Sequence, residues 1–405
     1  MGKIGKNSLD IQESNRLSIL RILAGEDVLT RAELSRRTGL KQATITNIIN
    51  DFLASGVVSE TGALRGNLGR RSIGIRINAE KFNVVAIKIA RRSYSVGIFN
   101  IKNQLLEKEY QKLDPAAGAS AVLERIVSDA RSLMQKYGSC CAVGVAVPGP
   151  YLRREGRIAV MTEFAGWEKI DICKQLGAAF EQPVFVEHDA NAGALGEWSR
   201  SANIGRDDVL VHLLASEGIG AGVVIGGKII SGYRGIFGEI GHMSINAMGP
   251  RCLCGNRGCL EMYCSALALV LPEHPESSLT SEQKITAEVI FRHMNAGDAY
   301  SRSAVLRTGH NLGCGVANLV NIYDPKEIVI SDVMSGGGEV MLQAIREAAK
   351  ERLLPEVWRD LTIRYSAVPE DLILYGAASV AIDKILEKTD AFSPSGADAP
   401  ESKPL

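Results

Sequence analysis

The first 60 residues show apolar positions at helical spacing, interrupted by two short polar turns. Apolar residues recur every three or four positions over residues 17–23, which predicts a first helix that is capped at Ser14 or Asn15 and ends before residue 25. Thr30 and Glu33 then form a capping box, in which a hydroxyl and a carboxylate satisfy the first free N–H groups of a helix. The pattern therefore predicts a second helix that ends near Gly39.

The third predicted helix spans residues 41–53 and has one apolar and one polar face. The polar face carries Gln42, Thr44, Thr46 and Asn47. Two short helices joined by a turn that contains glycine are typical of a helix-turn-helix. The polar residues suit contact with base edges in the major groove, with Lys41 on a phosphate. Since the same motif also occurs as a plain packing unit, the helices alone leave both interpretations open.

The next segment favours the DNA-binding interpretation. Residues 57–60 and 72–77 alternate between apolar and polar side chains, as strands do. The glycine-rich loop between them carries Arg65, Arg70 and Arg71. A hairpin tip with arginines is a wing that can meet phosphates or the minor groove, and the alternative is a solvated basic loop. We therefore predict a winged helix-turn-helix over residues 1–78.

Beyond residue 78 apolar strands alternate with helices, which indicates an α/β domain. Strands are predicted over residues 82–90, 94–100, 141–147, 183–187, 209–214 and 327–330, with a strand after the glycine-rich turn that begins at residue 218. Helices are predicted over residues 119–137, 281–294, 301–322 and 377–387. The tail, residues 389–405, is rich in Ser, Pro, Ala and acidic residues and is predicted to be disordered.

Composition adds a charge asymmetry to this picture. The 405 residues carry zero formal net charge, which argues against a nucleic-acid coat protein or a polybasic membrane binder. Residues 1–76 nevertheless contain twelve Lys or Arg and seven Asp or Glu, a net charge of +5, so the remainder is net −5. A basic end on an acidic body suggests that this end meets a polyanion. The chain opens without a signal peptide and no apolar run reaches the roughly 18 residues of a membrane span, so we expect a cytoplasmic protein.

Three of the eight cysteines lie within eight positions, behind a histidine. The order is His242-x9-Cys252-x-Cys254-x4-Cys259. Three thiolates and one imidazole form a closed tetrahedral set for Zn²⁺, and a closed set predicts a structural ion. The alternative is three free thiols in a glycine-rich turn, which is the less favoured interpretation because cysteines this dense in an otherwise cysteine-poor chain indicate a metal site.

Three segments resemble the signatures of the ROK family, which unites bacterial sugar-responsive repressors, unassigned relatives and sugar kinases. These segments are the glycine-spaced stretch 214–242, the cysteine motif 252–261 and the Val-Glu-His-Asp motif that ends at Asp189. With the winged helix-turn-helix in front, the layout is similar to the N-acetylglucosamine and glucose repressors of the family. The resemblance implies a two-lobed fold of the actin-like ATPase type with a sugar cleft between the lobes. It also implies sugar-contacting positions at His188, Asp189, Glu239, His242 and Glu261.

The chain departs from the kinases of this family at their phosphate-binding elements. Residues 88–92 read Lys-Ile-Ala-Arg-Arg where the kinases have Asp-x-Gly-Gly-Thr, and residues 216–218 read Ser-Glu-Gly where they have Gly-Thr-Gly. Ser331-Asp332 replaces their usual Gly-Gly, and His188 replaces their usual Asn. A carboxylate at the γ-phosphate position repels a nucleotide. We therefore predict that the chain is not an enzyme, and the alternative is a kinase that phosphorylates a hexose or amino sugar.

These observations predict a repressor of carbohydrate genes with four segments. They are the DNA-binding head 1–78, a first α/β lobe 79–190, a second lobe with the zinc motif 191–388, and the tail 389–405. A homodimer, or a dimer of dimers, would bind a palindromic DNA operator, and a sugar or sugar-phosphate effector would change the angle between the lobes. A third hypothesis is that a membrane transport protein sequesters the regulator.

Overall fold

The computed structural model describes residues 8–65, 71–114, 117–138, 140–159, 166–201, 204–205, 207–270, 286–368 and 371–387. The predicted tail and Arg70 lie outside the described residues, and Arg65 and Arg71 are described by their backbone alone. No helix within those ranges is long and apolar enough to span a membrane.

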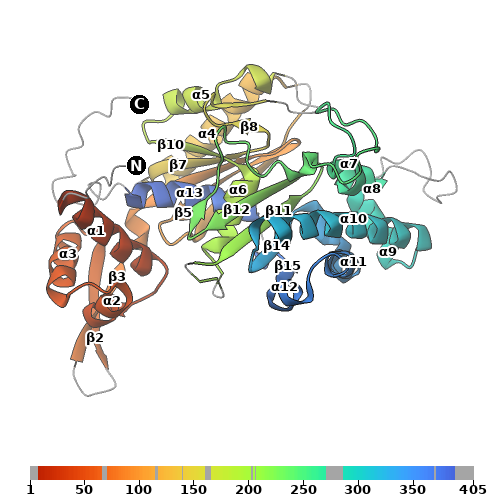
Figure 1. Ribbon diagram of the computed structural model, residues 1–405. Helices are drawn as coiled ribbons and strands as arrows, with labels where there is room; N and C mark the ends of the chain where they lie inside the picture. Colours follow the sequence, from red (N-terminus) through yellow and green to blue (C-terminus); the bar gives the residue numbers. More distant parts are fainter. Residues whose placement is uncertain are drawn as a thin grey trace.

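The head is a small bundle of three helices with a three-stranded sheet (Figure 1). Its elements are α1 (Ser8–Ala24), β1 (Leu29–Thr30), α2 (Arg31–Thr38), α3 (Gln42–Ala54), β2 (Val58–Arg65) and β3 (Arg71–Ile77), with strand order β1-β3-β2. The predicted capping box is confirmed, because the backbone N–H of Thr30 donates to Glu33 Oε2 at 2.8 Å and that of Glu33 donates to Thr30 Oγ1 at 3.2 Å. Gly39 ends α2 in the left-handed region, with φ 71°.

The first lobe is built on a five-stranded mixed sheet of order β10-β7-β4-β5-β6. Its strands are β4 (Asn83–Ile89), β5 (Ser93–Asn100), β6 (Leu105–Lys112), β7 (Cys140–Val147) and β10 (Val184–His188). The helices α4 (Ala119–Tyr137) and α5 (Ile172–Ala179) share one apolar core with it, as does the hairpin of β8 (Tyr151–Leu152) and β9 (Arg157–Ile158) that follows β7. A short 3-10 turn, Ala79–Lys81, connects this lobe to the head.

The second lobe repeats the arrangement with strand order β13-β12-β11-β14-β15. Its strands are β11 (Val209–Ala215), β12 (Ile219–Ile225), β13 (Lys228–Ile229), β14 (Glu327–Ser331) and β15 (Thr362–Tyr365). Its helices are α7 (Glu261–Cys264), α8 (Ala266–Val270), α9 (Ala287–Asn295), α10 (Ala299–Tyr323), α11 (Gly338–Lys350) and α12 (Pro355–Asp360). Most of them contribute to one apolar core with the sheet.

Two helices, α6 (Asp189–Trp198) and α13 (Leu372–Glu387), lie between the sheets and pack on each other (Figure 1). α6 also packs on β11 and β12, whereas α13 returns to the first lobe and packs on β4 and β7. Glycine makes this approach possible, since a Cβ on Gly376 of α13 would overlap the carbonyl oxygen of Ala192 of α6. A Cβ on Gly222 of β12 would likewise overlap the carbonyl oxygen of Ala190. The two helices therefore join the lobes with backbone-to-backbone contact.

The head rests on the far end of α13. The buried face of α1 (Ile19, Leu20 and Leu23) shares one apolar core with the last turns of α13 (Ile382, Ile385 and Leu386). Arg21 Nη2 lies 3.6 Å from Asp383 Oδ1 at this contact, and Lys102 Nζ lies 2.6 Å from Asp27 Oδ1 beside it. The head is thus in contact with the same helix that packs against α6.

Most of the predicted elements are confirmed, but two helix starts were wrong and several elements were missed. The first helix begins at Ser8 instead of near residue 16, and the last begins at Leu372 instead of residue 377. The helix predicted over residues 281–294 is described only from Ala287, since residues 271–285 lie outside the described residues. The elements that were not predicted include the strands β1, β6 and β15 and the helices α5, α6 and α11. The segment boundaries at residues 78, 190 and 388 stay predictions.

Replacing Gly376 with Ala should destabilise the protein by about 3 kcal/mol, because the added methyl group enters a space that the Ala192 carbonyl oxygen already fills. Gly177→Ala is the matched control, since Gly177 lies in α5 and a Cβ there has no neighbour within 4 Å. Ala at that position should be neutral or stabilise by up to about 1 kcal/mol. Urea unfolding measures both effects, and equal stability of the two variants would refute the close-packing argument.

Candidate functional site

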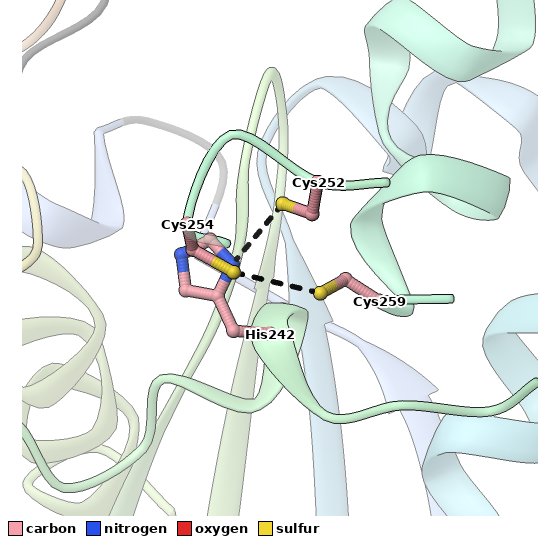
Figure 2. Close-up of side chains that lie close together, drawn as sticks. All are labelled: His242, Cys252, Cys254 and Cys259. Atoms are coloured by element: carbon pink, nitrogen blue, oxygen red, sulfur yellow. Dashed lines mark hydrogen bonds between the residues drawn. The ribbon is translucent and has the colours of Figure 1, made fainter. Parts of the chain in front are cut away.

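The predicted metal ligands converge on one point (Figure 2). His242 ends a short 3-10 turn (Ile240–His242), and the three cysteines follow on a tight loop. Backbone pairing of Arg251 with Arg257 closes that loop, and Gly255 adopts φ 95°, which an L side chain rarely tolerates. The candidate ligand atoms of His242, Cys252, Cys254 and Cys259 all lie within 4.8 Å of one another.

The spacing of these atoms fits a tetrahedral Zn²⁺ ion. Zn–S bonds of about 2.3 Å place two thiolates of a tetrahedron about 3.8 Å apart, and the Sγ atoms of Cys254 and Cys259 are 3.7 Å apart. With a Zn–N bond of about 2.1 Å, the expected N···S distance is about 3.6 Å, and Cys252 Sγ lies 3.8 Å from His242 Nδ1. The four residues could therefore hold one metal ion in a closed set.

Glu261 connects this cluster with the predicted sugar site. It is the first residue of α7, and its Oε1 lies 3.1 Å from His242 Nδ1 and 3.3 Å from Cys252 Sγ. The carboxylate contacts the same ring nitrogen that faces Cys252, so Glu261 lies at the edge of the candidate metal site. The structure thus brings together Glu261 and His242, which the sequence predicts as sugar contacts.

The other three predicted sugar contacts form a second group at the start of α6. His188 Nε2 lies 3.2 Å from Asp189 Oδ1 and 3.7 Å from Glu239 Oε1. Burial raises the pKa of both carboxyl groups, so both favour the neutral form more than an exposed carboxylate does. A Cβ on Gly149 would overlap the His188 ring and the Glu239 carboxylate, so the backbone there closes over the group. Alternating donors and acceptors of this kind suit the hydroxyl groups of a sugar.

A buried histidine behind this group was not predicted. His212 of β11 has no exposed surface, and its ring nitrogens lie 2.9 Å from the Ala190 carbonyl oxygen and 2.7 Å from Ser331 Oγ. It therefore supports the first turn of α6, directly after Asp189. Burial lowers the pKa of His212, so the neutral ring is favoured. The one signal in the sequence was a single polar residue within an apolar strand. Such a residue is buried with the strand, and a buried polar group needs hydrogen-bond partners.

Ion pairs occupy the region where the kinase phosphate elements would lie. Lys88 Nζ of β4 contacts Asp371 Oδ1 at 2.8 Å, and Arg92 Nε contacts Glu217 Oε1 at 3.0 Å. Ser216 Oγ donates to Asp332 Oδ1 at 3.0 Å. Sequence reasoning identified Lys88 and Glu217 as departures but missed Asp371, because that residue is 283 positions away from Lys88.

The head presents the predicted base-edge contacts on one helix, α3, with Lys41 directly before it. Lys41, Gln42, Thr46 and Asn47 are exposed, and Thr44 is partly buried. The Thr46 hydroxyl donates to the Gln42 carbonyl oxygen at 2.9 Å, so it can still accept a hydrogen bond from a base but can donate to one only by giving up that bond. α2 adds a basic residue that was not predicted as a contact, namely Arg36, whose side chain is 77% exposed.

Two family models match the chain. The model described as "ROK family" matches residues 84–384, and the model described as "Winged helix-turn-helix DNA-binding" matches residues 12–59. The matched ranges coincide with the two-lobed body and with most of the head. They confirm the predicted fold class, a winged helix-turn-helix followed by a two-lobed, actin-like ATPase domain of sugar-kinase type.

Relatives with similar sequences include two repressors. "Xylose repressor" of Bacillus subtilis (strain 168) is 26% identical over 380 residues, which cover 93% of this chain and 97% of the relative. "DNA-binding transcriptional repressor Mlc" of Escherichia coli (strain K12) is 25% identical over 384 residues, which cover 91% and 93%. Among solved structures, a ROK hexokinase from Thermus thermophilus is 30% identical with a TM-score of 0.64, and the match covers 75% of this chain and 99% of that one.

Stability should depend on pH through His212. Because burial lowers the pKa of this ring below the roughly 6.5 of an unfolded histidine, the unfolded chain takes up the proton first as the pH falls. The contribution of His212 is thus present above pH 6.5 and lost below it, at up to about 1.4 kcal/mol per pH unit. In urea unfolding at pH 7.5, 6.5 and 5.5, the free energy of unfolding should fall more steeply with decreasing pH for wild type than for His212→Gln. Parallel profiles would contradict this assignment.

Proposed function

The chain belongs to the ROK family, and from that premise we propose that it is a sugar-responsive transcriptional repressor of carbohydrate uptake or catabolism genes. One observation carries the proposal. The winged head rests on α13, and α13 packs against α6, whose first residue, Asp189, belongs to the predicted sugar site. Relatives named as a xylose repressor and as the repressor Mlc support the same conclusion.

The head supplies a surface that suits an operator half-site. Gln42, Thr44, Thr46 and Asn47 would contact base edges, and Lys41 would contact a phosphate, with the wing arginines 65, 70 and 71 beside them. A homodimer would present two heads to a palindromic operator. Arg36 extends the proposed phosphate-contacting surface onto α2, the helix that crosses the DNA backbone in this motif.

A sugar in the cleft would act on DNA through the central helices. His188, Asp189 and Glu239 would pair with hydroxyl groups at the start of α6, and His242 and Glu261 would pair with others across the cleft. Since α6 and α13 meet backbone to backbone, a change in lobe angle would displace α13 and the α1 contact with it. The fraction of dimers whose two heads are spaced to fit the operator would then change. Xylose is the first candidate effector, because a relative carries that name.

The cysteine cluster would hold one structural Zn²⁺ ion. Its four protein ligands complete a tetrahedron and leave no position for a substrate, which is typical of structural sites. When bound, the ion would fix the loop that carries His242 and the start of α7 at Glu261. Zinc would therefore stabilise one wall of the sugar cleft.

A kinase is the alternative that the hexokinase relative favours. The geometry argues against it, since Asp371 and Glu217 pair with Lys88 and Arg92 where a nucleotide would need free donors. Asp189 would then contact a sugar hydroxyl without receiving a proton for catalysis. Sequestration by a membrane transport protein and a cytoplasmic location both stay predictions.

The first test is operator binding with and without sugar. The full-length protein should bind an operator fragment selected from genomic DNA, and xylose or another neutral sugar should weaken this binding in fluorescence anisotropy. Asn47→Ala should weaken operator binding by about 1–3 kcal/mol. Lys41→Ala removes one phosphate contact, so the slope of the logarithm of the binding constant against the logarithm of the salt concentration should fall by about 1. Arg302→Ala, an exposed cation on α10, is the control that should change neither. A protein that binds no fragment at low salt would end this proposal.

The second test is zinc content. Wild type should contain about one Zn²⁺ per chain by elemental analysis, and Cys252→Ser should contain little. Cys140→Ser is the control, since Cys140 lies in β7 outside the cluster and its loss should leave zinc in place. The zinc-poor variant should also lose its sugar response together with operator binding, because the cleft wall loosens. Normal sugar-regulated operator binding by a zinc-free protein would contradict the role given to this loop.

A further inference from the structure

The charges at one end of the proposed sugar site bear on which sugars it accepts. We define the hairpin end as Lys88, Arg91 and Arg92 of the β4–β5 hairpin together with Glu217, Asp332 and Asp371, which face them. Asp189 is close enough to act on Lys88 electrostatically, as Asp371 and Asp332 do. A charged group attached to the sugar hydroxyl next to Asp189 would therefore lie near the hairpin end.

Carboxylates of the protein hold two of the three cations at this end. Lys88 Nζ lies 2.8 Å from Asp371 Oδ1, and the two side chains are only 19% and 16% exposed. Ser95 Oγ donates to the other oxygen of Asp371 at 3.3 Å, which fixes the carboxylate in place. Burial opposes the charge of Lys88, but Asp371 and Asp332 outweigh it and the pKa of Lys88 is raised, so the amine stays protonated.

Arg92 is contacted from the second lobe, and its side chain is 45% exposed. Its Nε lies 3.0 Å from Glu217 Oε1, and Glu217 is 23% exposed on the turn between β11 and β12. Arg91 is partly buried beside Gly218, and its charge acts on Glu261. The cations that could receive a phosphate thus already face carboxylates of the second lobe and of the segment before α13.

The charge balance is unfavourable for an anionic ligand. Glu217, Asp332 and Asp371 contribute three carboxylates against the three cations of the hairpin, so the charges at this end already balance. A phosphate would bring about −1.5 to −2 more charge into this balanced end, where Asp371 and Glu217 already engage Lys88 and Arg92. If the sugar bound in the reverse orientation, its phosphate would lie near Glu239 and Glu261, whose carboxyl groups also disfavour an anion.

We propose that the effector is an uncharged sugar, and that Glu217 and Asp371 exclude phosphosugars by holding the cations that a phosphate would need. This inference rests on the proposed function, because it assigns the ligand class of the same site. A neutral sugar needs no counter-charge, since its hydroxyl groups donate to Asp189 and Glu239 and accept from ring N–H groups. The excluded class includes the 5- and 6-phosphates of the sugars that would bind, and sugar acids.

Calorimetric titration of the full-length protein tests the proposal with xylose, glucose and N-acetylglucosamine, and with xylose 5-phosphate, glucose 6-phosphate and N-acetylglucosamine 6-phosphate. At least one neutral sugar should bind, and its phosphate should bind at least 100-fold more weakly. Glu217→Gln and Asp371→Asn keep the side-chain shape but release Arg92 and Lys88. Each should strengthen phosphate binding about tenfold and change binding of the neutral sugar less than threefold. Glu339→Gln, whose side chain is 62% exposed beside Arg346, is the control that should change neither.

The outcomes separate this proposal from the proposed function. A wild type that binds a phosphosugar as tightly as the parent sugar overturns the exclusion but leaves a sugar-responsive repressor. If folded Glu217→Gln protein binds the sugar phosphate no more tightly than wild type does, the exclusion is also overturned. Thermal unfolding of both variants shows whether they are folded. A loss of binding that is seen only in a misfolded Asp371→Asn protein is thereby recognised. A protein that binds none of the six compounds yet binds operator DNA overturns the proposed sugar response itself, and this inference with it.

Discussion

The close approach of α6 and α13 is the constraint on which the rest of the molecule depends. Gly376 and Gly222 bring the backbones of α13 and β12 against the carbonyl groups at the start of α6, where any larger residue would overlap. A contact without intervening side chains transmits displacement instead of absorbing it, because packed interiors have few alternative arrangements. The start of α6 carries the predicted sugar contact Asp189, and the end of α13 carries α1. This stack is therefore the physical link between cleft and head.

Ionic contacts between the lobes limit how the stack can move. Arg92 of the first lobe contacts Glu217 of the second lobe, and Arg153 of the β8–β9 hairpin donates to Ser231 Oγ of the second lobe at 2.7 Å. Lys88 contacts Asp371 beside the start of α13, so this pair ties the β4–β5 hairpin to that helix. In a kinase of this fold the same hairpin would hold phosphates. Since exposed ion pairs contribute little and are screened by salt, the partly buried Lys88 pair should matter most.

The parts of the fold that depend on residues close together in the chain were predicted well. The parts that depend on contacts between distant residues were not. The Thr30–Glu33 capping box, the metal-ligand spacing and the apolar strands depend on residues close in the chain. β6 was missed because this edge strand carries charged residues on both faces, so no alternation of apolar and polar residues marks it as a strand. The return of α13 to the first sheet and the Lys88–Asp371 pair depend on tertiary packing, which no local pattern encodes. His212 was overlooked because one polar residue in an apolar strand carries no periodic signal.

The central claim is that sugar and operator compete through one conformational equilibrium, and reciprocity tests it most directly. If a sugar weakens operator binding by a given factor, the operator must weaken sugar binding by the same factor. Titrating xylose, or whichever neutral sugar binds, into the free protein and into the protein–operator complex measures this factor. The account predicts sugar affinity at least fivefold lower in the complex, equal to the loss of operator affinity measured with saturating sugar. The same sugar affinity with and without operator would contradict it.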